Sequence, residues 1–154
     1  MTIGKGKSPF IAWFDPEATT VLRKEMDALT RELGTIKLSA KLSHALKDLE
    51  CYLDDLDAFI VELAVPFDDE DRKTFKGFKE EHPELQDTEL REEYAGLTLI
   101  NILHALKPEL PIMVYTHCKG ITSSIDVSYP KVSLVYNKSL GIEAVIQSLK
   151  KRVS

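Results

Sequence analysis

The sequence predicts an α/β domain with a doubly wound, five-stranded parallel sheet and helices on both faces. Three observations lead to this prediction. Short apolar runs, typical of buried strands, alternate with stretches whose apolar residues recur at helical spacing. The composition, 44% hydrophobic and 29% charged, is that of a globular protein with a core. The length of 154 residues is that of one domain.

The predicted strands are apolar over nearly their whole length. Strands that are buried on both faces of a parallel sheet have this character, whereas half-buried strands alternate apolar and polar residues. The expected ranges are 10–14, 35–38, 58–63, 111–116 and 132–136.

The segments between the strands carry the periodicity of helices that pack on a sheet. The first helix is expected over 15–33, because Gly34 follows it and glycine commonly ends helices. The stretch 117–130 is poor in helix formers, so any helix there should be short or mobile. The other helices are expected over 40–50, 96–107 and 141–153.

Residues 67–95 differ in composition from the rest of the chain. They contain eleven acidic and five basic residues, so this segment accounts for the acidity of a protein with a net charge of −5. Charge runs are usually solvated, and one or two helical turns are expected here. The embedded aromatic residues Phe75 and Phe78 leave a second interpretation open, in which the segment is a docking surface or a lid over a cleft.

The overall charge and apolar pattern exclude several classes of protein. A net charge of −5 argues against nucleic-acid binding through a basic surface. No apolar run reaches the ~20 residues of a membrane span, and no secretory signal is evident. We therefore expect a cytoplasmic protein in which Cys51 and Cys118 are reduced. Residues 1–8 are expected to form a flexible tail, and 9–154 a single domain.

The run FIVELAVP at 59–66 places one acid, Glu62, among apolar residues. Burying an unpaired carboxylate costs several kcal/mol, so Glu62 needs solvent or a cation. In parallel sheets, functional sites lie beyond the carboxyl ends of the strands. Asp15, Thr116 and Lys138 also stand at predicted strand ends, so all four side chains should converge on one cleft, where Lys138 can pair with Glu62.

This set of residues resembles the receiver domain of two-component response regulators. In that family an aspartate after the third strand accepts a phosphoryl group and a proline follows four residues later; Glu62 and Pro66 hold these positions here. Gly96 resembles the glycine that opens the next helix. Thr116 and Lys138 match the family's hydroxyl and lysine, and Asp15 matches one of two magnesium-holding acids. The resemblance implies a flavodoxin-like sheet of order 2-1-3-4-5.

The departures from the family pattern concern its chemistry. Phe14 replaces the other magnesium-holding acid, and Glu62 carries its carboxylate ~1.5 Å further out than an aspartate does. Ser139 stands where the family usually has proline. Tyr136 lies two residues before the lysine, although the family's switch aromatic usually lies three before it. The acidic segment 67–95 resembles an insertion.

Each site residue also has a simpler interpretation. Asp15 is followed by Pro and Glu, which is ordinary helix-capping chemistry, so capping and metal binding both stay open. Glu62 is interpreted as an ion-pair partner or a fixed mimic of phosphorylation rather than as an acceptor. Thr116 is equally at home as the end of a strand. His117 and Cys118 lack a second pair at metal-ligand spacing and are not assigned to catalysis.

The function expected from this resemblance is that of a stand-alone receiver-like signalling module, not an enzyme and without a cofactor. It would act through protein partners, with a surface that includes Tyr136, Ile142 and Lys150; a homodimer is left open. The alternative is a phosphorylatable receiver or a small enzyme that uses magnesium in the cleft of Asp15, Glu62, Thr116 and Lys138. A small-ligand sensor is a third hypothesis.

Overall fold

The strands of the computed structural model pair in parallel in the order β2-β1-β3-β4-β5. The structure describes residues 9–18, 20, 22–88, 95–116 and 134–153. The predicted α/β class and parallel sheet are confirmed, whereas the expectation for 117–130 lies outside the described residues. The strands are β1 (Phe10–Phe14), β2 (Thr35–Ser39), β3 (Ala58–Val61), β4 (Ile112–Thr116) and β5 (Leu134–Asn137).

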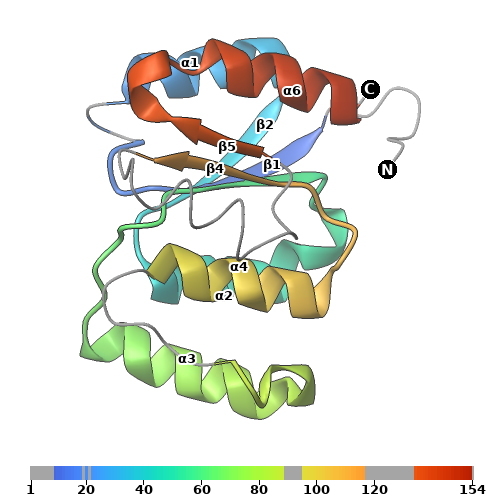
Figure 1. Cartoon of the computed structure of the whole chain (residues 1–154). Helices are drawn as coiled ribbons and strands as arrows, with labels where there is room; N and C mark the ends of the chain where they lie inside the picture. The colour runs from blue at the N-terminus through green and yellow to red at the C-terminus, as the bar shows by residue number, and fades with distance from the viewer. Residues whose placement is uncertain (1–8, 19, 21, 89–94, 117–133, 154) are drawn as a thin grey trace.

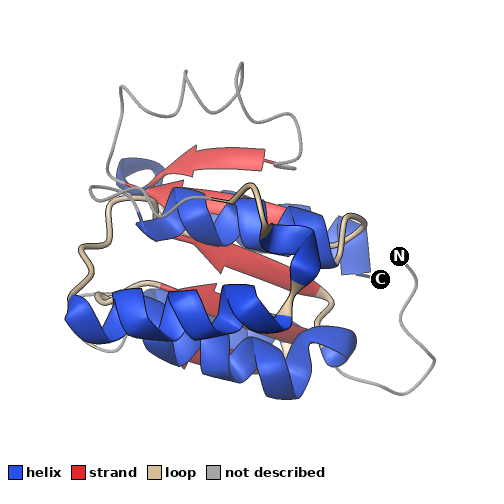
Figure 2. Cartoon of the chain, turned by 90° about the horizontal axis from the view of Figure 1, so that it is seen from below, coloured by secondary structure: helices blue, strands red, loops and turns tan. Residues whose placement is uncertain are grey.

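Helices cover both faces of the sheet, as predicted. α1 (Arg23–Leu33) and α6 (Glu143–Val153) lie on one face, and α2 (Leu42–Tyr52) and α4 (Ala95–Leu106) lie on the other (Figure 1). Figure 2, the view from below, shows helices in front of the strands. Successive residues of a strand point to opposite faces, so β1 contributes to two cores. Trp13 packs in the core on the α1 and α6 side, and Phe14 in the core on the α2 and α4 side.

The first helix begins eight residues later than predicted. α1 starts at Arg23, and Pro16–Ala18 form turns instead. The reason lies in the sequence Thr-Thr-Val at 19–21, because β-branched residues have a low helix propensity. Leu22 is the residue at the N-cap of α1, so the capping alternative for Asp15 does not apply to this helix.

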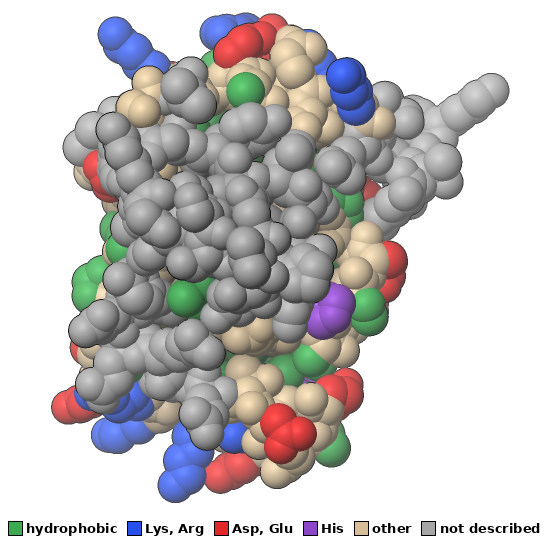
Figure 3. Space-filling view, in the orientation of Figure 1, with side chains coloured by type: hydrophobic (Ala, Val, Ile, Leu, Met, Phe, Trp, Pro, Cys, Tyr) green, Lys and Arg blue, Asp and Glu red, His purple; other side chains and the backbone are tan. Residues whose placement is uncertain are grey.

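The acidic segment contains more helix than the predicted one or two turns. α3 (Asp69–Glu81) has 13 residues and is followed by the short 3-10 helix η2 (Pro83–Leu85). Asp68 and Asp71 form a capping box at the start of α3. α3 lies on the side of α2 and α4 that faces away from the sheet, as a third layer (Figure 1). Charged side chains of both signs surround this end of the molecule (Figure 3).

Two further short helices connect the strands to their neighbours. η1 (Leu53–Asp55) follows α2, and η3 (Lys138–Leu140) follows β5. The Nζ of Lys107, just after α4, donates to the carbonyl oxygens of Leu53 and Leu56 at 2.9 Å and of Asp54 at 3.2 Å. This contact ties the end of α4 to the connection before β3. Within the described part of the chain, no helix is long and apolar enough to cross a membrane.

Candidate functional site

Three of the four predicted site residues directly follow strands of the sheet and meet at the edge formed by the carboxyl ends of the strands. Asp15 follows β1, Glu62 follows β3 and Lys138 follows β5. Backbone hydrogen bonds extend the sheet to this point: Asp15 N donates to Ser39 O and Glu62 N donates to Phe14 O, both at 2.9 Å. Thr116, the fourth, is fully buried at the end of β4.

The ammonium group of Lys138 lies at the centre of three carboxylates. Its Nζ is 2.7 Å from Asp15 Oδ2, 3.0 Å from Glu17 Oε1 and 3.1 Å from Glu62 Oε1. The side chain of Lys138 is 1% exposed. Lys138 Nζ donates hydrogen bonds to Glu17 and Glu62, and its contact with Asp15 is a close ion pair. We call Asp15, Glu17, Glu62 and Lys138 the ion-pair cluster.

Both carboxylate oxygens of Glu62 are engaged. Oε1 accepts a hydrogen bond from Lys138, and Oε2 accepts one from the backbone N–H of Leu63 at 2.7 Å. The predicted pairing of Glu62 with Lys138 is confirmed. The acid inside the apolar run is thus buried with a cation and a backbone donor, which removes the penalty for an unpaired charge.

Asp15 holds the turn that brings Glu17 into the cluster. Its Oδ1 accepts a hydrogen bond from the N–H of Glu17 at 2.8 Å, an Asx turn across Pro16. Sequence reasoning placed Glu17 in the first turn of a helix and missed it as a partner of Lys138. The signal was the sequence Asp-Pro-Glu directly after a strand, since a turn there returns the second acid to the strand end.

Burial and charge act in opposite directions on the cluster. Burial raises the pKa of the Asp15 carboxyl group above its ordinary value, and Lys138 opposes this only in part. Burial alone would lower the pKa of Lys138, but the contacts with Asp15, Glu62 and Glu17 outweigh it and raise that pKa above its ordinary value. The ammonium group is therefore charged at neutral pH.

The two acids to which the family resemblance assigns a metal, Asp15 and Glu62, both contact the ammonium group of Lys138. Among the described residues no group of three or more His, Cys, Asp or Glu side chains is arranged to hold a metal ion. Phe14, at the position of the family's second acid, packs its side chain into the core on the α2 and α4 side. Asp15 and Glu62 instead share the single positive charge of Lys138 with Glu17.

Gly96 allows the start of α4 to approach the end of β3 closely. A Cβ atom at this position would lie 2.2 Å from Glu62 O and 2.6 Å from Leu63 Cα. The N–H of Gly96 donates to Leu63 O at 3.1 Å, and that of Ala95 donates to Val65 O at 3.2 Å. These contacts fix the backbone that carries Glu62.

The predicted partner surface needs one correction. Ile142 is 8% exposed and packs in the core on the α1 and α6 side, because it directly precedes α6 and faces the sheet. Lys150 is partly exposed and pairs with Glu32 of α1 at 2.6 Å. Tyr136 lies in β5, with its backbone opposite Tyr115. His117 and Cys118 lie outside the described residues, and Cys51 is a free, exposed thiol.

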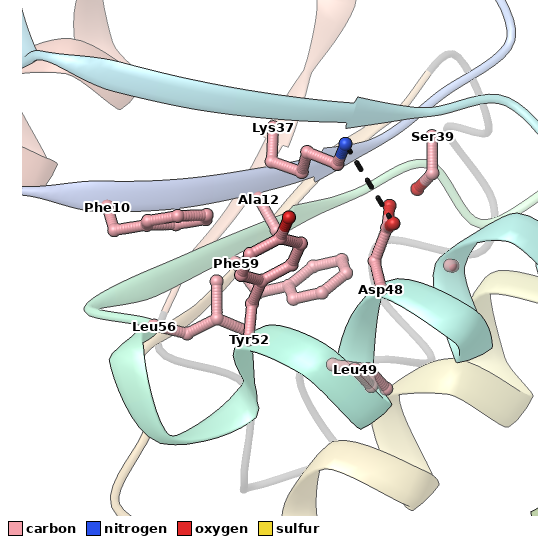
Figure 4. Close-up of a pocket in the computed structure, with 10 residues that line it drawn as sticks. Phe10, Ala12, Lys37, Ser39, Asp48, Leu49, Tyr52, Leu56 and Phe59 are labelled. Atoms are coloured by element: carbon pink, nitrogen blue, oxygen red, sulfur yellow. Dashed lines mark ion pairs between the residues drawn. The ribbon is translucent and has the colours of Figure 1, made fainter.

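A small, shallow groove, partly open to solvent, lies between α2 and strands β1, β2 and β3 (Figure 4). Its floor is apolar, and Phe10 and Tyr52 form an aromatic pair with ring centroids 5.4 Å apart. Lys37 and Asp48 face each other above it at 3.9 Å. None of the ion-pair cluster residues lines this groove, which is therefore separate from the cleft at the strand ends.

Comparisons with solved structures identify the fold as that of response regulator receiver domains. A receiver domain protein from Clostridium thermocellum is similar with a TM-score of 0.67 and 11% identity, over 94% of each chain. The signal receiver domain of an HD domain-containing protein from Pseudomonas fluorescens Pf-5 has a TM-score of 0.68 and 13% identity, over 98% of this chain and 90% of that one.

A third similar structure is a response regulator protein from Thermotoga maritima in complex with Mg²⁺-BeF, with a TM-score of 0.65 and 16% identity over 94% of this chain and 99% of that one. No protein-family model and no curated protein sequence matches the chain.

Proposed function

We propose that the protein is a receiver-like signalling module that acts through protein contacts and does not transfer phosphoryl groups. The observation that carries this proposal is the closed ion-pair cluster. Lys138 contacts Glu62 at 3.1 Å, and the second oxygen of Glu62 is occupied by the Leu63 N–H. A phosphoryl group on Glu62 would have to displace one of these partners.

The absence of an acid at Phe14 supports the same proposal. Phosphoryl transfer depends on cations that neutralise the developing charge, and magnesium in such sites is held by carboxylates. Asp15 and Glu62 already share the Lys138 ammonium at 2.7 and 3.1 Å. We therefore propose that the protein works without magnesium or another cofactor, and that it is not an enzyme.

Under this proposal the Glu62 carboxylate is a permanent negative charge that takes the place of a reversible phosphorylation. Its carboxylate reaches Lys138 without modification, so the lysine is held in one position. The output must then come from binding to partner proteins of a signalling pathway in the cytoplasm, with a homodimer as a further proposal. Tyr136 and Lys150 remain proposed contact residues, whereas the buried Ile142 does not.

The test is phosphoryl labelling of the intact protein. We would incubate the wild type, Glu62→Asp and Glu62→Ala with magnesium and a small acyl phosphate and measure intact mass. We expect no mass gain in the wild type, because its carboxylate is engaged. Glu62→Ala is the control for labelling elsewhere in the chain.

A wild type that gains a phosphoryl group at Glu62 would contradict the proposal. Labelling of Glu62→Asp alone would show that the cleft can support phosphorylation of an aspartate. The extra methylene of Glu62 would then be what prevents phosphorylation of the wild type. If neither is labelled, the loss of the acid at Phe14 is sufficient to prevent the chemistry.

A further inference from the structure

The insertion that contains α3 leaves and re-enters the fold at adjacent points. The N–H of Ala95 donates to Val65 O at 3.2 Å, and the N–H of Gly96 donates to Leu63 O at 3.1 Å. β3 and α4 are thus joined directly by backbone hydrogen bonds at the base of the insertion. Among the described residues, the strand pairing and the β3–α4 connection use no hydrogen bond from α3. Release of α3 would leave both in place and would expose Phe75 and Phe78, which are 7% and 3% exposed in the docked helix.

α3 packs on α2 through polar and apolar contacts. Asp71, 1% exposed, accepts hydrogen bonds from the N–H of Ser43 at 2.9 Å and from the N–H of Asp68 at 2.9 Å. Phe75 and Phe78 are the apolar anchors, and they belong to the core cluster that includes α2. The exposed Lys41 adds an ion pair with Asp68 at 2.8 Å.

The same contacts show which groups of α2 would lose their partners if α3 were released. The N-cap residue of α2, Lys41, provides no side-chain cap, and the N–H of Ser43 finds its acceptor in Asp71. If α3 left, this N–H and the apolar surface beneath the two phenylalanines would face solvent. The vacated face would therefore favour another helix that brings a carboxylate and aromatic side chains.

The composition of α3 makes it a weak helix in isolation. Isolated helices of this length are marginal in water, so α3 depends on its packing. Gly77 lies exposed in its interior, and a Cβ atom added there would meet no other atom within 4 Å, so no packing constraint requires glycine at this position. A glycine in an exposed helix interior lowers helix stability relative to alanine.

We propose that the α2 face under α3 is a helix-docking surface, which α3 occupies within the chain and an amphipathic helix of a partner protein occupies when α3 is released. The partner helix carries a carboxylate and aromatic side chains four and seven positions after it, the spacing of Asp71, Phe75 and Phe78. This inference rests on the proposed function, because it supplies a surface for its protein contacts.

The test uses a fluorescent synthetic peptide of residues 68–85 as the probe and anisotropy as the readout. The full-length chain is compared with Gly77→Ala, which strengthens α3, and with Asp71→Ala, which weakens its docking. We expect affinity for Gly77→Ala to be about fivefold lower than for wild type, the factor expected from the Gly-to-Ala difference in helix propensity. Asp71→Ala should bind the peptide more tightly than wild type.

Two controls separate docking from unspecific binding. A peptide with both phenylalanines replaced by alanine should not bind, and the chain variant Lys24→Gln, at an exposed position of α1 on the other face of the sheet, should bind like wild type. Equal affinity of wild type and Gly77→Ala would overturn the proposal, as would lack of binding to every chain. Because this readout does not involve Glu62, its failure is distinguishable from a failure of the proposed function.

Hydrogen exchange provides a measurement that does not depend on the folding of Asp71→Ala. Amides of α3 should exchange faster than those of β1 and β3 in the wild type, and about fivefold more slowly in Gly77→Ala, with the sheet unchanged. If the amides of α3 exchange at the same rate as those of the sheet, α3 opens only with global unfolding and the proposal is wrong.

Discussion

Lys138 is the residue on which the candidate site depends. Its ammonium is buried among three carboxylates, and one of them, Asp15, has a fully buried side chain. A buried ion pair adds little stability compared with an apolar pair, but removing one partner leaves the other charges uncompensated. The cluster is therefore a specific arrangement that does not tolerate the loss of its cation.

Lys138→Met should lower the free energy of unfolding by about 3–5 kcal/mol, because Asp15 and Glu62 would remain buried without a cation. The loss should be smaller at acidic pH, where the Asp15 carboxyl group, whose pKa burial raises, is protonated. Denaturant unfolding measures the effect, and Lys150→Met, which breaks an exposed pair with Glu32, is the control with an expected loss of about 0–1 kcal/mol. Equal losses in the two variants would show that the cluster contributes no more than a surface pair.

Tyr115 provides a second test at the residue scale. Burial raises its pKa to about 12, and Glu25 adds to the shift. Between pH ~10 and ~12 the unfolded tyrosine loses its proton while the folded one keeps it, so stability falls by about 3 kcal/mol as pH rises through this window. Tyr115→Phe should lack this part of the alkaline loss. Phenolate absorbance that rises near pH 10 for all tyrosines would contradict the prediction.

Two helices on the same side of the sheet, α4 and α3, each contain a glycine, and the two glycines have different surroundings. In α4, Gly96 lies so close to Glu62 and Leu63 that a Cβ atom would overlap their backbone. In α3, Gly77 is exposed and has open space around it. The same substitution should therefore have opposite signs in the two elements.

Gly96→Ala should destabilise the fold by about 1–3 kcal/mol or more, because backbone atoms of the β3 end must move to admit the methyl group. Gly77→Ala should stabilise it by up to about 1 kcal/mol through helix propensity. Thermal and denaturant unfolding of the two variants measure both effects. A change of the same sign in both would show that the close approach at Gly96 is not maintained in solution.

At the scale of the whole molecule, the described part of the acidic segment that forms α3 and η2 lies in a third layer, away from the cleft at the strand ends. α3 packs on α2 and η2 on α4, whereas the cleft lies at the ends of β1, β3 and β5. The lid interpretation of the segment is not supported by this position in Figure 1. The docking interpretation underlies the proposal that the α2 face under α3 binds a partner helix.

Magnesium should not raise the melting temperature of the wild type at millimolar concentration, because the Lys138 ammonium already occupies the space between Asp15 and Glu62. In Lys138→Met the carboxylates lose their cation, and we expect magnesium to stabilise this variant by mass action. Thermal scans with magnesium, and with sodium at equal ionic strength as control, measure the difference. Stabilisation of the wild type by magnesium alone would contradict a cluster closed by lysine.

The strands and most helices could be predicted because their signal is local. Runs such as Phe10–Phe14 are apolar throughout, and the period of side chains along a strand or helix is a property of neighbouring residues. The meeting of Glu62 with Lys138 was also predictable, since parallel strands bring their carboxyl ends to one edge of the sheet.

Tertiary structure decided what local patterns do not encode. Glu17 joins the cluster only because a turn returns it toward Lys138, 121 residues further along the chain. The sequence of α3 is mostly charged, but α3 forms a full helix because Asp71, Phe75 and Phe78 pack against α2. Ile142 is buried because it faces the sheet. In each case the deciding free energy comes from contacts between distant segments, which form only once the chain has folded.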